Sequence, residues 1–119
     1  MSDSVYRAKA EFFKTLGHPV RIRIIEVLAG GSRSVSAMQP DVGVESAHLS
    51  QQLAIMRRAG IVSAERQGSS MIYSVVDPQV FELLSAAKQI ITTRLTSEGE
   101  LLADFDAVSY EQKPRGARR

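Results

Sequence analysis

The segment that most constrains the fold of this chain lies between Val35 and Val76. A short helical pattern begins at Val35 and gives way to a turn around Gly43. A second helical pattern follows over residues 46–59, and Gly60 ends it. Two short helices joined by a tight turn predict a helix-turn-helix motif.

Two strand-like runs follow this motif directly. They cover residues 61–66 and 71–76, and the polar residues 67–70 join them. Short runs of this kind around a glycine-containing turn predict a β-hairpin. A hairpin placed after a helix-turn-helix is a wing, so the sequence predicts a helix and a hairpin tip side by side as a candidate DNA-docking surface.

Helical patterns flank this segment on both sides. Residues 5–16 have apolar side chains at helical spacing, and Pro19 suits the first turn of a second helix that runs to about Ala29. Pro78 opens a last long helical pattern. We therefore expect a mainly α fold with a small β-hairpin, in the order α-α-α-α-β-β-α, which is a winged helix-turn-helix.

The length of 119 residues fits one domain, which we place at residues 1–97. Residues 98–119 are expected to form a flexible charged tail. Four Lys/Arg and one Glu fall in residues 111–119, whereas residues 1–110 hold 11 Lys/Arg and 12 Asp/Glu. The basic character of the chain therefore comes from its end and is weak evidence for nucleic-acid binding.

Composition excludes several classes of protein. No apolar run approaches the roughly 20 residues that span a bilayer, and the start lacks the apolar core of a signal peptide. We therefore expect a cytoplasmic protein without membrane contact. The chain has no cysteine, which excludes disulfides and thiolate metal sites. The sequence shows no nucleophile-base pattern and no Gly-rich phosphate loop, so nothing in it indicates an enzyme.

The helix over residues 46–59 is the predicted recognition helix. At 100° per residue, Leu49, Leu53 and Met56 share one face and should anchor it to the core. Its N-terminal part would enter the major groove, where Gln pairs with adenine and a small side chain contacts the thymine methyl. The predicted base-reading residues are Gln51, His48 and Ala47. The alternative is an exposed polar face without a partner.

Further polar and basic residues surround these positions on the helix and the hairpin tip. Basic and hydroxyl side chains near a groove-binding helix contact phosphates, and a wing tip can reach the adjacent minor groove. The predicted phosphate and wing contacts are Ser46, Ser50, Arg57, Arg58, Arg66, Gln67, Ser69 and Ser70. The alternative is that any hairpin of this composition has a polar tip.

The first and last helices have wide apolar stripes that need a cover. They can pack on each other within one chain or pair with a second copy, and we expect both together, in a homodimer. The predicted dimer-interface residues are Tyr6, Phe12, Phe13, Val80, Phe81, Leu84, Ile91 and Leu95.

Several spaced motifs resemble the ArsR/SmtB family of bacterial winged helix-turn-helix regulators. They are FFKTLGHPVRIRI at 12–24, LSQQL at 49–53, RAGIV at 58–62, RQG at 66–68 and YSV at 73–75. The likeness covers residues 10–95. It implies a homodimer built on the first and last helices that binds an imperfect palindrome in a promoter, and an effector that alters operator affinity.

The chain departs from the metal sites of the family. Residues 34–36 read Ser-Val-Ser where a metalloid site has Cys-Val-Cys, and hydroxyls do not replace thiolates for soft metals. At the second family site only Asp77 matches, because Gln79, Ile90 and Thr93 stand at the other positions. We therefore expect no metal site and no cofactor in this chain.

Three smaller departures concern single residues. Gln52 stands where many members have His, which puts the base or phosphate role of that position in doubt. Glu45 stands where a Ser or Thr cap is usual, so we expect Ser46 to cap the recognition helix. His18 precedes Pro19 and is expected to cap or pack at its helix start and not to bind metal.

The sequence therefore predicts a sequence-specific transcriptional regulator, a repressor by family resemblance, with double-stranded operator DNA as its partner. Its signal would be a small molecule or a partner protein at the C-terminal tail, or the regulator would have no effector at all. The alternatives are a winged-helix protein-interaction module that has lost DNA binding, and a directly metal-responsive repressor with a non-standard site.

Overall fold

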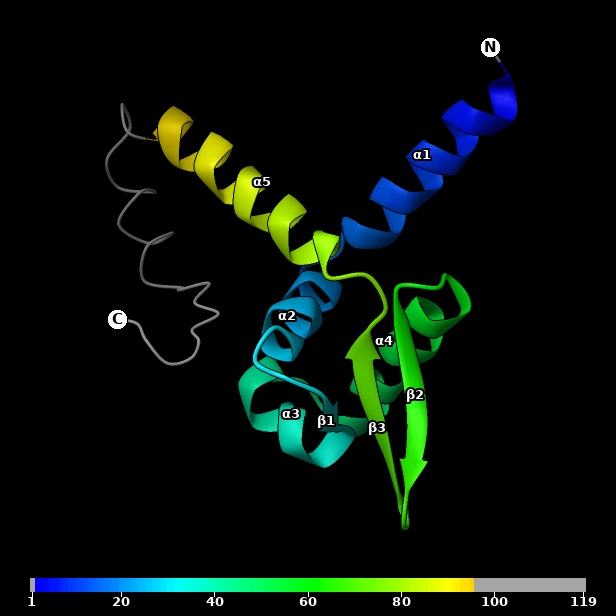
Figure 1. Cartoon of the computed structure of the whole chain (residues 1–119). Helices are drawn as coiled ribbons and strands as arrows, with labels where there is room; N and C mark the ends of the chain where they lie inside the picture. The colour runs from blue at the N-terminus through cyan, green and yellow to red at the C-terminus, as the bar shows by residue number, and fades with distance from the viewer. Residues whose placement is uncertain (1, 96–119) are drawn as a thin grey trace. The chain divides into compact units, whose positions relative to one another are not determined.

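The computed structural model describes residues 2–95, which divide between Val76 and Asp77 into two units (Figure 1). The predicted order of helices and wing strands is confirmed, and one short strand is added to it. The elements are α1 (Asp3–Leu16), α2 (Pro19–Leu28), β1 (Arg33–Ser34), α3 (Val35–Val42), α4 (Ser46–Arg58), β2 (Val62–Gln67), β3 (Ser70–Val75) and α5 (Gln79–Leu95).

Local capping explains where α2 begins. Pro19 occupies the first turn of α2, where its missing N–H costs no hydrogen bond. His18 is the N-cap of α2, and its Nδ1 accepts a hydrogen bond from the Val20 N–H at 3.2 Å. The predicted capping role of His18 is therefore confirmed.

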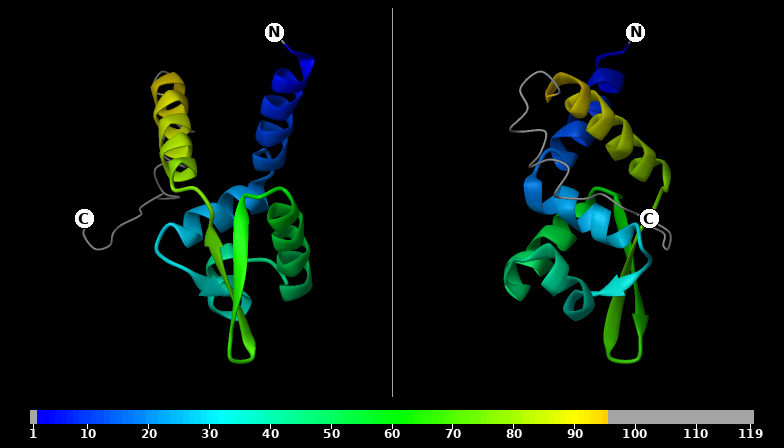
Figure 2. Two further views of the ribbon diagram at one scale, coloured as in Figure 1. Left: turned by 45° about the vertical axis from the view of Figure 1, so that its right-hand side comes forward. Right: turned by 90° about the vertical axis from the view of Figure 1, so that its left-hand side faces the viewer.

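The first unit is built around one apolar core. The deepest positions of α2 are Ile24, Ile25 and Leu28, whereas Val20 and Val27 are half-buried. Helix α1 adds only Leu16 to this core and projects away from α2, α3 and α4 (Figures 1 and 2). The core side chains of the first unit are Leu16, Ile24, Ile25, Leu28, Met38, Val42, Leu49, Leu53, Met56, Ile61 and Val62.

The sheet has three antiparallel strands in the order β1-β3-β2. Sequence analysis predicted the two wing strands but missed β1, in which Arg33 pairs with Tyr73 and Ser34 with Ile72. Each wing strand lies one residue nearer the tip than expected, because Gln67 pairs with Ser70 and leaves a two-residue turn. Figure 2 shows its tip extending past helices α3 and α4.

The second unit contains α5. The Asp77 carboxylate accepts a hydrogen bond from the Gln79 N–H at 2.9 Å, which caps the start of this helix. Along α5, Val80 is buried, while Ile90 and Ile91 are exposed. The predicted tail at 98–119, and its boundary, lie outside the described residues. Over residues 2–95, none of the helices has the length and apolar character that a membrane span requires.

Candidate nucleic-acid interface

The turn between α3 and α4 fixes the angle between the two helices of the motif. Pro40 lies inside α3, which is only eight residues long, since a proline does not favour a longer helix. Gly43 ends α3 in the left-handed region at φ 82°, and its N–H donates to the Gln39 carbonyl at 2.8 Å. The Gln39 side chain donates to the Val44 carbonyl at 3.1 Å. The backbone and the side chain of Gln39 therefore both hold the turn by hydrogen bonds.

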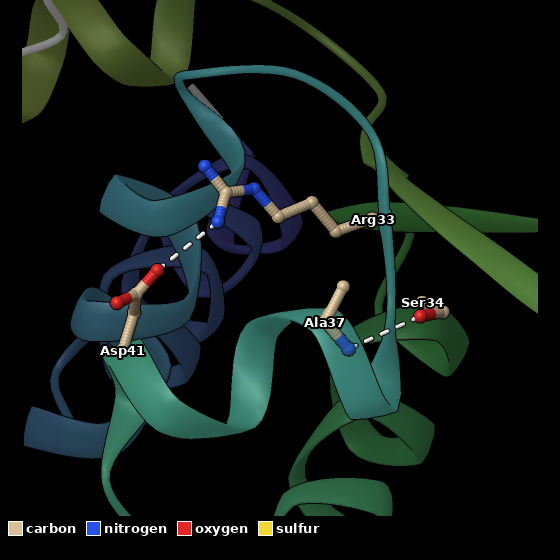
Figure 3. A network of polar contacts seen from close by, with 4 residues as sticks. All are labelled: Arg33, Ser34, Ala37 and Asp41. Carbon is tan, nitrogen blue, oxygen red and sulfur yellow. Dashed lines mark hydrogen bonds and ion pairs between the residues drawn. The ribbon is translucent and has the colours of Figure 1, made fainter.

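A small polar network holds the start of α3 (Figure 3). Ser34 is the N-cap, and its hydroxyl accepts a hydrogen bond from the Ala37 N–H at 3.1 Å. Arg33 of β1 forms an ion pair with Asp41 near the other end of α3, at 3.0 Å. Where the family resemblance places a metal-binding cysteine, this chain therefore has a capping hydroxyl.

The recognition helix α4 is anchored as predicted. Leu49, Leu53 and Met56 are fully buried. Its N-cap is Glu45, whose side chain makes no capping hydrogen bond. The expectation that Ser46 caps the helix is wrong, because Ser46 is already the first helical residue. The N–H groups of the first turn are therefore not covered by a capping side chain, and they are suited to an anion such as a phosphate.

The opposite face of α4 is open. Ala47, Ser50, Gln51 and both arginines at 57 and 58 are exposed, and His48 is half-buried. Among the residues predicted to read bases, Gln51 and Ala47 are thus exposed, whereas His48 is half-buried. This face has two positive charges at its C-terminal end, and within the helix no acidic residue offsets them.

Gln52 differs from the other polar residues of α4. It is 7% exposed, and its Oε1 accepts a hydrogen bond from Arg21 Nε at 2.8 Å. It lies about 60° around the helix from Leu49, which brings it to the edge of the core. Gln52 therefore belongs to the interior of the unit, and it is not available to a base or a phosphate.

The wing carries its polar residues at the tip. Arg66, Gln67, Ser69 and Ser70 are all exposed. Gly68 makes the tight turn possible at φ 62°, a conformation that other residues adopt at a cost. Strand β2 contacts α4, so the wing and the recognition helix are parts of one packed unit.

Three of the predicted dimer residues, Tyr6, Phe13 and Ile91, are exposed in the single chain. Tyr6 and Phe13 of α1 are 55% and 57% exposed, and Phe12 packs against the Phe13 ring edge-on at 5.4 Å between centroids. In α5, Ile91 is exposed, and Phe81 and Leu84 are half-buried. Val80 is 7% exposed in the single chain, and its place in the interface stays a prediction. The side chain of Leu95 lies outside the described residues.

Metal ligands are not gathered anywhere in residues 2–95: no group of three or more His, Cys, Asp or Glu side chains could hold an ion there. His18 and Asp77 both serve as helix caps.

A packed helix-turn-helix with a hairpin wing, an exposed polar recognition face and basic groups on both elements is a winged helix-turn-helix DNA-binding domain. The model of the bacterial regulatory protein arsR family matches residues 18–64. The uncharacterized HTH-type transcriptional regulator Rv0081 of Mycobacterium tuberculosis is 49% identical over 107 residues, which cover 89% of this chain and 94% of the relative. The chain belongs to the ArsR family of transcriptional regulators, and it is not an enzyme.

Solved structures agree with this assignment. The crystal structure of Rv0081 matches with a TM-score of 0.73 and 50% identity, over 82% of this chain and 98% of that one. A further relative by sequence, the biofilm growth-associated repressor of Xylella fastidiosa, is 33% identical over 71% of this chain and 75% of its own length. A homodimeric winged helix-turn-helix domain from Mycobacterium bovis, Mb0332, shares the fold with a TM-score of 0.68 and 24% identity, over 84% and 94% of the two chains.

Proposed function

We propose that this chain is a repressor that binds an imperfect palindromic operator as a homodimer. The observation that carries the proposal is the open face of α4, with the exposed wing tip on the same packed unit. A helix of this kind fits the major groove, and a hairpin tip beside it reaches the neighbouring backbone or minor groove.

Base reading is assigned to the N-terminal half of α4. Gln51 is exposed and can pair bidentately with an adenine, and Ala47 can lie against a thymine methyl. His48 contributes a ring nitrogen at the margin of this face. Gln52, which follows Gln51 directly, has no part in it because it is buried and bonded to Arg21.

Backbone contacts are assigned to the hydroxyls and arginines around this face. Ser46 and Ser50 lie near the N-terminus of α4, where the helix itself favours a phosphate. Arg57 and Arg58 extend from its last turn. In the wing the contacts are assigned to Arg66, Gln67, Ser69 and Ser70. Two half-sites with a few such contacts each should neutralise about 4–8 phosphates, which gives a slope of roughly −4 to −7 in log K against log salt.

Fluorescence anisotropy on duplexes selected from a random pool tests this function. Gln51→Ala should cost about 1–3 kcal/mol at one base pair per half-site and relax the preference there. Arg57→Ala and Arg66→Ala should weaken all sequences alike and flatten the salt slope. Gln79→Ala, which removes an exposed glutamine at the start of α5, is the matched control and should change neither quantity. An unchanged sequence preference in Gln51→Ala would overturn the base-reading assignment.

Dimerisation is supported by the apolar surface that α1 and α5 expose in the single chain, chiefly Tyr6, Phe13 and Ile91. The similar Mb0332 domain is homodimeric, which favours the same state here. A two-fold dimer also matches the symmetry of a palindromic site.

The response to a signal is the remaining part of the proposal. We assign it to a small molecule, or to a partner protein that binds the C-terminal residues 98–119. Four Lys/Arg and one Glu in residues 111–119 would suit an acidic partner surface. Deleting residues 111–119 should weaken capture of such a partner while leaving sequence preference intact. Unchanged binding to DNA and to every captured protein would contradict this role.

A further inference from the structure

One arginine of α2 joins two other helices of the first unit. Arg21 Nε donates to the Gln52 side-chain oxygen at 2.8 Å, and Arg21 Nη1 donates to the Thr15 carbonyl oxygen at 3.1 Å. Thr15 lies at the end of α1, and Gln52 lies in the middle of α4. A single planar guanidinium therefore spans the distance between α1 and the recognition helix.

The local sequence explains why Thr15 needs this donor. In a continuing helix, the Thr15 carbonyl would accept from the N–H four residues later, but that residue is Pro19, which has none. Arg21 supplies the missing donor. Its positive charge also suits the C-terminal end of a helix, which has a partial negative charge.

At the other end of the bridge, the polar Gln52 side chain is buried. A buried amide oxygen that loses its donor is left without a partner, which is costly. The guanidinium fork allows few geometries when it donates to two fixed acceptors. The bridge therefore resists both rotation and translation of α4 relative to the end of α1.

We propose that Arg21 is a positioning residue that sets the half-site spacing which the dimer accepts. The inference rests on the proposed homodimer, in which the exposed face of α1 around Tyr6 and Phe13 meets a second copy. The distance between the two recognition helices then depends on how each α4 is held relative to its own α1. One base pair changes the half-site separation by about 3.4 Å and turns it around the DNA axis.

The test uses duplexes of about 40 base pairs that the wild-type protein selects from a random pool, with the central spacer then shortened or lengthened by one or two base pairs. Wild type should prefer its own spacing by about 5–150-fold, the range of a local misfit in a specific complex. In Arg21→Met and in Gln52→Leu this preference should fall to below about 3-fold, while affinity for an isolated half-site stays within about 3-fold of wild type.

Three further measurements separate positioning from other roles. Gln52→Glu keeps the acceptor and should keep the spacing preference. The double variant Arg21→Met/Gln52→Leu should be no less selective than Arg21→Met alone, because both changes break the same bridge. The salt slope should stay at its wild-type value, since losing one phosphate contact in each protomer would lower the slope of the dimer by about two. Arg33→Gln, which breaks an exposed ion pair, is the control and should keep the preference.

Each other outcome overturns the proposal. Equal loss of affinity at every spacing would mean that Arg21 only supports the fold, and a lower salt slope would make it a phosphate contact. If Arg21→Met does not fold, Gln52→Leu decides, because it removes only the acceptor. Failure of the wild-type protein to bind any selected duplex would refute the proposed function itself, and it would appear before any variant is made.

Discussion

Replacing Phe13 by alanine should dissociate the proposed dimer. The Phe13 side chain lies on α1 and is 57% exposed in the single chain. With about 200 Å² for a phenylalanine, roughly 100 Å² of ring surface is available to a partner. At about 25 cal/mol per Å² this surface contributes about 2.5 kcal/mol per protomer, or about 5 kcal/mol per dimer if the partner covers it fully.

Even partial coverage leaves a measurable effect. If the partner covers half of the ring surface, the change is about 2.5 kcal/mol per dimer and raises the dissociation constant roughly 70-fold. Sedimentation equilibrium over a wide concentration range measures this constant directly. Val76→Ala is the matched control, because Val76 is 55% exposed and lies outside the predicted interface.

The two variants together decide the assignment. The interface on α1 is supported if Phe13→Ala dissociates at concentrations where Val76→Ala and wild type remain dimeric. A dissociation constant for Phe13→Ala within about 2-fold of wild type would refute the reasoning, since a covered ring must lose area when it is removed. Circular dichroism should show unchanged helix content, because Phe13 adds nothing to the core of the unit.

Two further predictions concern the start of α3 and metal ions. Ser34→Ala removes the hydroxyl that accepts from the Ala37 N–H. It should therefore lower the free energy of unfolding by about 1 kcal/mol and the melting temperature by about 4–8 °C. The control Ser36→Ala leaves this cap in place and should change both quantities little. Calorimetry with zinc or nickel should show no binding tighter than micromolar, because the chain has no cysteine and His18 is engaged as a cap; submicromolar binding at a whole-number stoichiometry would contradict this.

Sequence patterns were sufficient for the order of the helices and the wing, because apolar periodicity and glycine or proline breaks define each of these elements. Strand β1 was missed because two residues, Arg33 and Ser34, are too short for any periodicity. They become a strand only by pairing with β3. The cap of α4 was also assigned wrongly, since Glu45 takes the N-cap position with no side-chain hydrogen bond.

The hydrogen bonds that join Arg21 to Gln52 and Thr15 were not predicted from the sequence. Helix angles place Gln52 at the edge of the core, but they do not show which side chain covers it. Its partner, Arg21, lies 31 residues earlier in the chain. One signal was available: Pro19 leaves the Thr15 carbonyl without its usual donor, and this points to a nearby cation.

The pairing of β1 with β3 has a consequence for protein engineering. Arg33 and Ser34 immediately precede α3, and they hydrogen-bond to the strand that returns from the wing tip. A graft of another regulator's wing onto this chain must therefore replace three strands, although a hairpin suggests two. Chimeras that exchange residues 62–75 alone would leave β1 facing a foreign partner, whereas chimeras that also carry residues 33–34 would transfer the sheet as a whole.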